Sequence, residues 1–334
     1  MKKFQKSAGR GLFVLTFLIV GLILCVNDCQ AEWKWQNPLP QGNDLNDIWG
    51  SSADNVFAVG NGGTILHYDG SNWSGMSSGT SGYLYGVWGS SGDNVFAVGG
   101  NGTILHYNGS NWSGMSSGTS ECLNGVWGSS GDNVFAVGNG GTILHYDGSN
   151  WSAMTSGTIQ GLNDVWGSSA DDVFAVGWVG TILHYDGSNW SGMSSGTTFE
   201  KLSAVCGSSE DNVFAVGSDI DLAPILLFKY IILHYNGSEW TEMSSGSTGL
   251  LNDVWGSSAN DIFAVGSGGT ILHYNGSNWS AMTSGTIQGL NAVWGSSAND
   301  IFAVGSGGTI LHYTSQLTPT FLPGVLMLLL GSGM

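Results

Sequence analysis

The sequence predicts an all-β fold, a seven-bladed β-propeller in which each blade has four short strands. A unit of about 39 residues occurs seven times along the chain. Every unit contains four strand candidates separated by turn residues, which is the size of one propeller blade. The 55 glycines, 15 tryptophans and 9% charged residues suit short strands and tight turns rather than a helical bundle. A β-solenoid is the weaker alternative, because its coils are usually shorter.

The units share the motif Trp-Gly-Ser-Ser. Cys206 takes the Trp place in the fifth unit. The spacing between successive motifs is nearly constant, and only the step from Cys206 to Trp255 is clearly longer. The six intact motifs begin at Trp49, Trp88, Trp127, Trp166, Trp255 and Trp294.

Within a unit we name the strands a to d in chain order. In the first unit, strand a covers about Leu45 to Trp49 and strand b covers Val56 to Val59. Strand b is continuously apolar, which indicates that both of its faces are covered. Strand c is Thr64 to Tyr68, and strand d starts at Trp73 and is the most polar. The Asp-Gly or Asn-Gly pair between c and d favours a tight hairpin, because both positions tolerate a positive φ.

The two ends of the repeat are complementary. The seventh unit stops after strand c, at Tyr313. The segment Trp35 to Pro38 resembles a strand d with no earlier strand before it, because Trp35 precedes Trp49 by nearly the same interval as Trp73 precedes Trp88. We therefore expect this N-terminal strand to complete the C-terminal blade, which closes the ring and removes two exposed sheet edges.

The chain divides into an export signal (1–31), the propeller (32–314) and an apolar tail (315–334). A basic start and the apolar stretch Leu12 to Val26 predict a signal peptide that is cleaved after Ala31. The mature chain would then be periplasmic, on the cell surface or secreted. It would contain no stable membrane span unless the signal stays uncleaved.

The net charge limits the class of partner, and the cysteine positions argue against a disulfide. The full chain has a net charge of −17, and cleavage would leave three lysines, no arginine and 23 acids, a net charge of −20. This balance argues against nucleic acid as a partner. Cys122 and Cys206 lie in different units, so we expect two free, buried thiols rather than a disulfide. We also expect a monomer without a cofactor.

Three segments of the unit resemble the bacterial BNR and Ycf48/HCF136-like propeller repeats: Val56 to Gly60, Gly63 to Leu66, and Asp69 to Trp73. The last is similar to an Asp-box turn but is one residue shorter. The resemblance covers residues 33 to 313 and implies the fold, since such propellers host many functions. Sialidases of this class need an arginine cluster, so the lack of arginine in the predicted mature chain argues against that activity. Residues 319–333 resemble a truncated PEP-CTERM sorting signal without its basic tail.

Nothing in the sequence predicts catalysis or a metal site. All seven histidines occupy the repeated Leu-His-Tyr of strand c, so we expect each to bond a turn group in its own or the next blade. Asp219 and Asp221 are far from a complete Ca²⁺ cage. The chain lacks a nucleophile elbow and a phosphate loop, and an enzyme needs a convergent, asymmetric set of groups.

Departures from the repeat point to the functional surface. The a–b and c–d turns are nearly constant, and they leave one end of the ring, which we call the uniform face. The d–a and b–c connections vary, and they leave the other end, the varied face. Loops on a rigid scaffold commonly bind partners, so we expect a non-enzymatic propeller that binds an extracellular protein or glycan there. The candidate residues are Tyr83, Tyr85, Trp178, Phe199, Lys201, Leu222, Ile225 and Phe228.

Two other functions are open. A multivalent lectin would use the repeated tryptophans of strands a and d as equivalent sugar platforms between blades, provided that the rings are exposed. A propeller enzyme other than a sialidase is the third possibility.

The fifth unit carries an insertion, within Ser218 to Tyr230. It is rich in Ile, Leu and Phe, so it would cover the channel mouth, lengthen strands b and c, or present an apolar patch. We expect contact with a partner, with Trp178 as a neighbouring anchor. A merely lengthened hairpin is the alternative.

Overall fold

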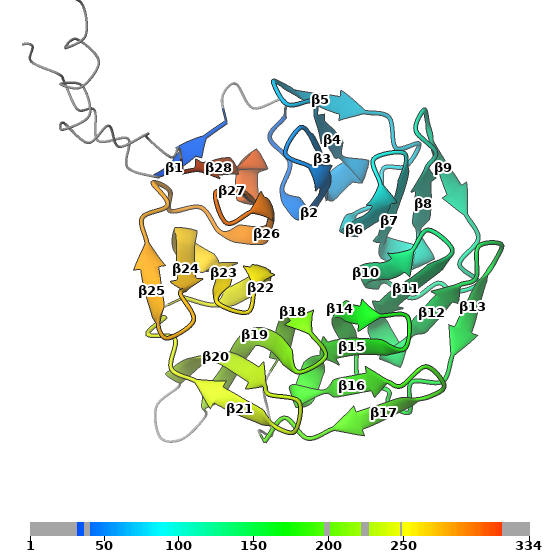
Figure 1. The fold of residues 1–334 in the computed structure, drawn as a ribbon. Coiled ribbons are helices and arrows are strands. Elements are labelled where there is room, and N and C mark those ends of the chain that lie inside the picture. Colours follow the sequence, from blue (N-terminus) through cyan, green and yellow to red (C-terminus); the bar gives the residue numbers. More distant parts are fainter. Residues whose placement is uncertain (1–31, 37–40, 197–200, 222–226, 248, 316–334) are drawn as a thin grey trace, which may run out of the picture.

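The structure is a computed structural model that describes residues 32–36, 41–196, 201–221, 227–247 and 249–315. Within these residues the strands form seven four-stranded antiparallel sheets, arranged as blades around a central axis (Figure 1). The predicted seven-bladed β-propeller is therefore confirmed.

The innermost strand of each blade is strand a, and these strands neighbour one another around the central axis. They are β2 (Leu45–Ser52), β6 (Leu84–Ser91), β10 (Leu123–Ser130), β14 (Leu162–Ser169), β18 (Lys201–Ser209), β22 (Leu251–Ser258) and β26 (Leu290–Ser297). Strand b comes next and is buried along almost its whole length, as its apolar run predicts. The b strands are β3 (Asn55–Gly60), β7 (Asn94–Gly99), β11 (Asn133–Gly138), β15 (Asp172–Gly177), β19 (Asn212–Asp221), β23 (Asp261–Gly266) and β27 (Asp300–Gly305).

The third strand of each blade contains the repeated Leu-His-Tyr. The c strands are β4 (Ile65–Tyr68), β8 (Ile104–Tyr107), β12 (Ile143–Tyr146), β16 (Ile182–Tyr185), β20 (Leu227–Tyr235), β24 (Thr270–Tyr274) and β28 (Ile310–Thr314). The outermost strand is short and starts at a tryptophan in blades one to six. These d strands are β5 (Trp73–Met76), β9 (Trp112–Met115), β13 (Trp151–Met154), β17 (Trp190–Met193), β21 (Trp240–Met243) and β25 (Trp279–Met282).

Apolar clusters fill the spaces between neighbouring blades. The ring of Phe57 in the first blade lies 5.6 Å from the ring of Tyr107 and 6.2 Å from that of Trp112, both in the second blade. The inner Trp49 packs on Gly89 of the second blade, where a Cβ atom would lie 2.6 Å from the indole. The Trp-Gly pair thus recurs because each inner tryptophan needs a glycine on the next blade.

Tight turns join the strands. In the c–d turn, the Asp69 carboxylate accepts hydrogen bonds from the backbone N–H groups of Ser71 and Asn72, at 2.9 and 2.7 Å. Only Gly70 of the Asp-Gly pair takes a positive φ, of 88°. The b–c connection is a single 3₁₀ turn in six blades. These turns are η1 (Asn61–Gly63), η2 (Gly100–Gly102), η3 (Asn139–Gly141), η4 (Trp178–Gly180), η5 (Ser267–Gly269) and η6 (Ser306–Gly308).

The N-terminal strand β1 (Glu32–Trp35) completes the last blade, in the sheet order β1-β28-β27-β26. Closure is as predicted, but the predicted bounds, Trp35 to Pro38, are wrong. Trp33 pairs with Tyr313, as Trp73 pairs with Tyr68, and only 7% of Trp33 is exposed. The motif spacing fits neither tryptophan perfectly, so burial against Tyr313 decides the register. Residues 37–40, including Pro38, lie outside the described residues.

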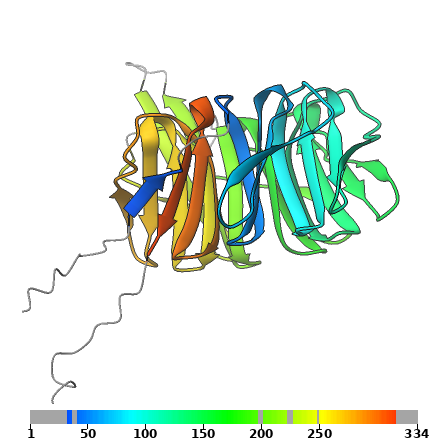
Figure 2. The same cartoon turned by 90° about the horizontal axis from the view of Figure 1, so that it is seen from above.

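The insertion in the fifth blade lengthens its middle hairpin. Strands β19 and β20 stay paired as far as Asp221 and Leu227, and Figure 2 shows them rising beyond the neighbouring blades. The insertion thus extends strands b and c, one of the three outcomes considered. Its tip, residues 222–226, lies outside the described residues.

Candidate functional site

Side chains near the uniform face form the same internal contacts in every blade. In every blade the histidine Nε2 lies 2.5–2.8 Å from the side-chain oxygen of the first residue of strand b. The expected structural role of the histidines is therefore confirmed, with the partner in the same blade. This partner is Asn in four blades and Asp in three, as the pairs His67–Asn55, His106–Asn94, His145–Asn133, His184–Asp172, His234–Asn212, His273–Asp261 and His312–Asp300 show.

Each of these histidines also packs against the phenylalanine of strand b. The ring centroids of Phe96 and His106 lie 4.7 Å apart. Burial lowers the pKa of His106 and of the other three histidines that face Asn. In the described part of the chain, no three His, Cys, Asp or Glu side chains come together in a way that could hold a metal ion.

Large exposed apolar side chains gather on the varied face. Among the described residues, every large apolar side chain that is classed as exposed lies in a d–a connection, in a b–c turn, or at the end of β1 that reaches this face. The uniform face presents none of them. These residues are Trp35, Tyr83, Ile159, Trp178, Val179 and Ile287.

Trp178 and Lys201 are separate predictions of the sequence, and the structure brings them together. The Lys201 Nζ lies 5.3 Å from the centre of the Trp178 ring, an arrangement that favours a cation–π interaction. Burial lowers the pKa of Lys201. The Trp178 backbone N–H donates to the Gly161 carbonyl at 3.0 Å. A Cβ atom on Gly161 would lie 3.1 Å from the indole, so the glycine makes room for the ring.

The residue after Trp178 has an unusual backbone. Val179 has a φ of 58°, where four other 3₁₀ turns have glycine and one has Asn101, with a φ of 55°. A β-branched residue is a rare outlier in this left-handed region. The fourth blade thus holds a strained residue beside an exposed tryptophan, on the face where the repeat varies.

Tyr83 and Tyr85 form a second aromatic pair at the start of β6, with ring centroids 6.3 Å apart. Tyr83 is more than half exposed, and burial raises the pKa of the partly buried Tyr85. This pair lies at the second blade, whereas Trp178 and Lys201 lie in the fourth and fifth blades. Of the remaining candidates, Phe199, Leu222 and Ile225 lie outside the described residues, and only the backbone of Phe228 is described, in β20.

The list of candidate residues from the sequence omits four of the exposed side chains: Trp35, Ile159, Val179 and Ile287. A signal for the two isoleucines was present, because residues 149–163 and 277–291 have the same sequence, SNWSAMTSGTIQGLN. A Ser-Gly-Thr motif holds both of these loops: the Ser284 Oγ donates to the Thr286 carbonyl at 3.2 Å, and the Ser156 Oγ donates to the Thr158 carbonyl at 3.2 Å. The residues that follow the motif vary from blade to blade.

The expectation for the cysteines was half correct. Both are free, and Cys206 is buried, but Cys122 is partly exposed. Cys122 is partly exposed because it ends a d–a connection of the varied face, just before β10. The Tyr83 position in the preceding connection is likewise exposed.

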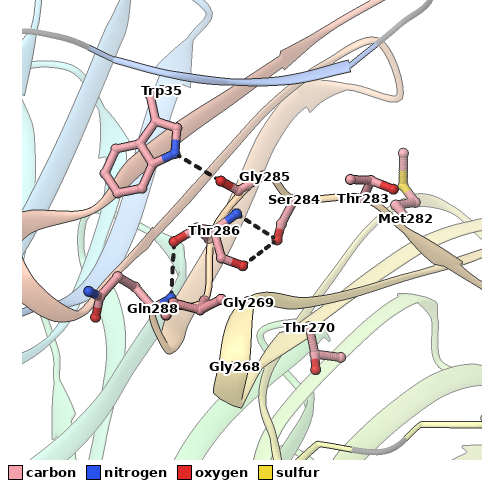
Figure 3. Close-up of a pocket in the computed structure, with 11 residues that line it drawn as sticks. Trp35, Gly268, Gly269, Thr270, Met282, Thr283, Ser284, Gly285, Thr286 and Gln288 are labelled. Atoms are coloured by element: carbon pink, nitrogen blue, oxygen red, sulfur yellow. Dashed lines mark hydrogen bonds between the residues drawn. The ribbon is translucent and has the colours of Figure 1, made fainter.

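Open grooves lie beside the two identical loops. One has a volume of about 650 Å³ and is lined by Trp35, the turn around Gly268 and the loop from Met282 to Gln288 (Figure 3). The other, about 610 Å³, lies at the matching place in the third blade. The repeated tryptophans of strands a and d are instead packed between blades, and none of them is classed as exposed; Trp35, an extra tryptophan in β1, is the exception. The equivalent sugar platforms of a multivalent lectin therefore lack the exposed rings that they need.

Three carboxylates lie in the innermost strands. Asp47 accepts from the Ile48 N–H at 2.8 Å and from the Val87 N–H of the next blade at 2.7 Å. Burial, more than the nearby charge of Asp164, raises the pKa of Asp47 to about 8. Burial likewise raises the pKa of Asp164 to about 6 and that of Asp253 well above its usual range. These carboxylates join neighbouring blades.

The comparisons with known proteins show the fold. No protein-family model and no curated protein matches the chain. A solved structure described as YCF48 bound to D1 peptide is similar, with a TM-score of 0.69 and 17% identity over 85% of this chain and 95% of that one. YCF48 from Cyanidioschyzon merolae has a TM-score of 0.67 and 19% identity, over 85% and 99%. The WD40 propeller domain of Doa1 has a TM-score of 0.69 and 13% identity, over 86% and 98%.

Among the residues that the structure describes, no helix is long and apolar enough to cross a membrane. In its fold, the chain is similar to propellers of the YCF48 and WD40 kinds.

Proposed function

We propose that the chain is a non-enzymatic interaction propeller that binds a protein partner through its varied face. The observation that carries this proposal is the placement of the exposed large apolar side chains on that one face. Exposed apolar side chains that share one face of a folded protein, as these do, are available for contact with a partner. Trp and Tyr are also the residues that contribute most at protein interfaces.

The centre of the proposed contact is the Trp178–Lys201 pair. Lys201 is one of three basic residues in the predicted mature chain, so this is a rare positive group on a strongly acidic protein. Its ammonium lies over the indole, which holds the ring in place before a partner arrives. A preordered aromatic side chain loses less entropy on binding. The strained Val179 next to it supports a functional role, because such strain often occurs at binding sites.

The solved structures support a peptide-like segment as the kind of partner. One propeller with this fold is described as bound to a peptide. We propose an extended protein segment as the partner here as well. The lengthened hairpin of β19 and β20 begins beside Lys201, which pairs with Ser218, so it would form one wall of the contact.

We also propose that the chain is exported, as its N-terminal sequence predicts. Glu32 pairs with Thr314 at the uniform face, so both ends of the described ring leave from that side. An anchor at either end would keep the uniform face toward a membrane and leave the varied face free to bind.

Site-specific photo-crosslinking tests the proposed contact. A photoreactive phenylalanine replaces Trp178 in one exported chain and Asp147, on the uniform face, in a control chain. We expect a crosslinked protein at position 178 and none at position 147. Equal crosslinking at both positions, or none at either, would rule out the varied face as the binding surface.

The crosslinked partner then permits a quantitative test. In titrations with this partner, Trp178→Ala should weaken binding at least tenfold, about 1.4 kcal/mol. Replacing residues 218–231 with the Ser-Gly-Gly-Thr turn of the sixth blade should also weaken binding tenfold while the ring stays folded. Unchanged partner affinity in the shortened chain would show that the hairpin is not part of the contact.

A further inference from the structure

Trp35 is the largest departure from the repeat among the outer strands. It pairs with Leu311 of β28, two residues after the buried Trp33. Every other outer strand has a smaller or charged residue in this register, and 37% of Trp35 is exposed. The equivalent residues are Gly75, Gly114, Ala153, Gly192, Glu242 and Ala281.

The indole of Trp35 forms one wall of the groove at the junction of the sixth and seventh blades. Figure 3 shows it facing the loop that joins these blades, and its Nε1 donates to the Gly285 carbonyl at 3.4 Å. Bonds within the loop fix the opposite wall, since the Gln288 N–H donates to the Thr286 Oγ1 at 3.0 Å. Both walls are thus ordered without a ligand, which reduces the entropy cost of binding.

The described residues that line this groove carry no charge. They combine an aromatic ring, the partly buried Met282 and the exposed Ile287 with hydroxyl groups, glycine backbone and the Gln288 amide. Within the described residues, the Gln288 side chain is exposed and no hydrogen bond engages its amide group. A volume of about 650 Å³ is in the usual range for small-ligand sites.

We propose that this groove binds a neutral, β-linked saccharide, with one pyranose ring stacked on Trp35. In gluco-configured β-1,4 chains the hydroxyls are equatorial, so each ring face carries only axial C–H groups. Such a face fits the electron-rich face of an indole. The Gln288 amide and the Thr283 and Thr286 hydroxyls supply donors and acceptors for the equatorial hydroxyls, whereas the Thr270 hydroxyl already donates to the Ser267 carbonyl at 2.8 Å. A charged ligand would find no ionic partner among the described lining residues.

This site differs from a multivalent lectin, because the blades are not equivalent here. It also lies apart from the proposed protein contact, since Trp178 and Lys201 do not line the groove. The third blade provides a natural control. Its loop has the same sequence over residues 149–163, and its groove is nearly as large, about 610 Å³. Gly192 stands there in the register of Trp35. If the indole is the platform, the third-blade groove should not bind.

The test is a titration of the mature chain with cellotetraose and with tetra-N-acetylchitotetraose, measured by calorimetry and by saturation-transfer NMR. We expect one site per chain for at least one of the two probes. Trp35→Ala, which copies Ala153 and Ala281, should weaken binding at least tenfold. Trp35→Phe should retain most of the binding, because it keeps an aromatic face. Trp178→Ala should leave saccharide binding unchanged, which separates this site from the proposed protein contact.

The converse variant is Gly192→Trp. Its Cβ atom has no neighbour within 4 Å, so a side chain fits there. We expect the number of saccharide sites to rise from one toward two. Melting curves show whether each variant is folded. The proposal is wrong if neither probe binds the folded wild-type chain, if Trp35→Ala binds as well as wild type, or if an uncharged acetylated tetrapeptide amide binds equally well at Trp35.

Discussion

The uniform and varied faces arise from the same seven repeats but use their side chains differently. On the uniform side, each histidine is bonded to strand b, and each Asp or Asn of the c–d turn caps its own backbone. On the varied side, a Ser-Gly-Thr motif holds the d–a loops that follow the first, second, third and sixth blades, and the next residues project as Tyr83, Ile159 or Ile287. One face therefore stabilises the ring, while the other displays side chains that folding leaves unused.

This difference predicts separate consequences for mutations. Changes near the uniform face and at the buried carboxylates of the innermost strands should alter stability and leave partner binding unchanged. Changes on the varied face should alter binding with little loss of stability.

The largest effect should come from opening the ring. Deleting residues 32–36 removes β1 and exposes the edge of β28, so we expect the chain to lose its monomeric fold and to associate. Trp33→Ala alone should cost about 3–5 kcal/mol, because the ring is buried against Tyr313. The matched control is Trp35→Ala in the same strand, which should cost less than about 1 kcal/mol. Melting curves and light scattering measure both. A deleted chain that stays monomeric with an unchanged melting temperature would contradict the closed ring.

The next largest effect on stability should come from the buried carboxylates of the innermost strands, Asp47, Asp164 and Asp253. Because burial raises the pKa of Asp47 to about 8 from an ordinary 3.8, the folded state holds its proton more tightly than the unfolded state does. This contribution favours the fold at low pH and is lost as the pH rises from about 4 to 8. Asp164 and Asp253 act in the same direction.

Asp47→Ala, which copies Ala204 and Ala292 of other blades, should therefore flatten the fall in unfolding free energy between pH 4 and 8. Asp69→Asn, which copies Asn108 on the uniform face, is the control. Backbone hydrogen bonds lower the pKa of Asp69, so its contribution is lost only at lower pH. Denaturant titrations across this range give the slopes. An unaltered slope in Asp47→Ala would show that the buried carboxylates of the innermost strands do not set the pH dependence of the unfolding free energy.

A smaller effect should distinguish the two kinds of histidine pair. Burial lowers the pKa of His106, which faces Asn94, below its ordinary 6.5. Its contribution to stability is therefore present above pH 6.5 and is lost as the pH falls. Asn94→Asp places a carboxylate beside the imidazole, which favours the charged form. We expect this change to reduce the acid loss by up to about 1 kcal/mol.

The reciprocal change, Asp172→Asn in the fourth blade, should enlarge the acid loss. Neither variant should affect partner binding, since both lie near the uniform face. Unfolding at pH 5 and at pH 7 provides the comparison, and identical pH profiles for the two variants would show that the histidines are not packed as described.

The smallest effect should come from Val179 on the varied face. Val179→Asn copies Asn101, which tolerates the same left-handed backbone. Relief of the strain should raise the unfolding free energy by about 0.5–1 kcal/mol. We expect partner binding to weaken at the same time, because an apolar contact is lost. Val179→Ala keeps the strain and is the control. A loss of stability in Val179→Asn would show that Val179 is not strained.

The sequence by itself determined the repeat, the strand order, the seven blades and the direction of ring closure. These properties depend on local patterns: the apolar run of strand b, the Asp-Gly turn and the regular recurrence of Trp-Gly-Ser-Ser are all visible within one unit or between adjacent units. The division into a uniform and a varied face also follows from the sequence, because antiparallel strands alternate in direction.

Only the tertiary structure decided which side chains are free. Trp33 rather than Trp35 closes the ring, because burial against Tyr313, at the opposite end of the repeat, selects the register. Lys201 meets Trp178 across two blades, and Asp47 is held by the N–H group of Val87 in the next blade. These contacts join segments of different repeats. Local periodicity cannot determine them, since each depends on how neighbouring blades pack against each other.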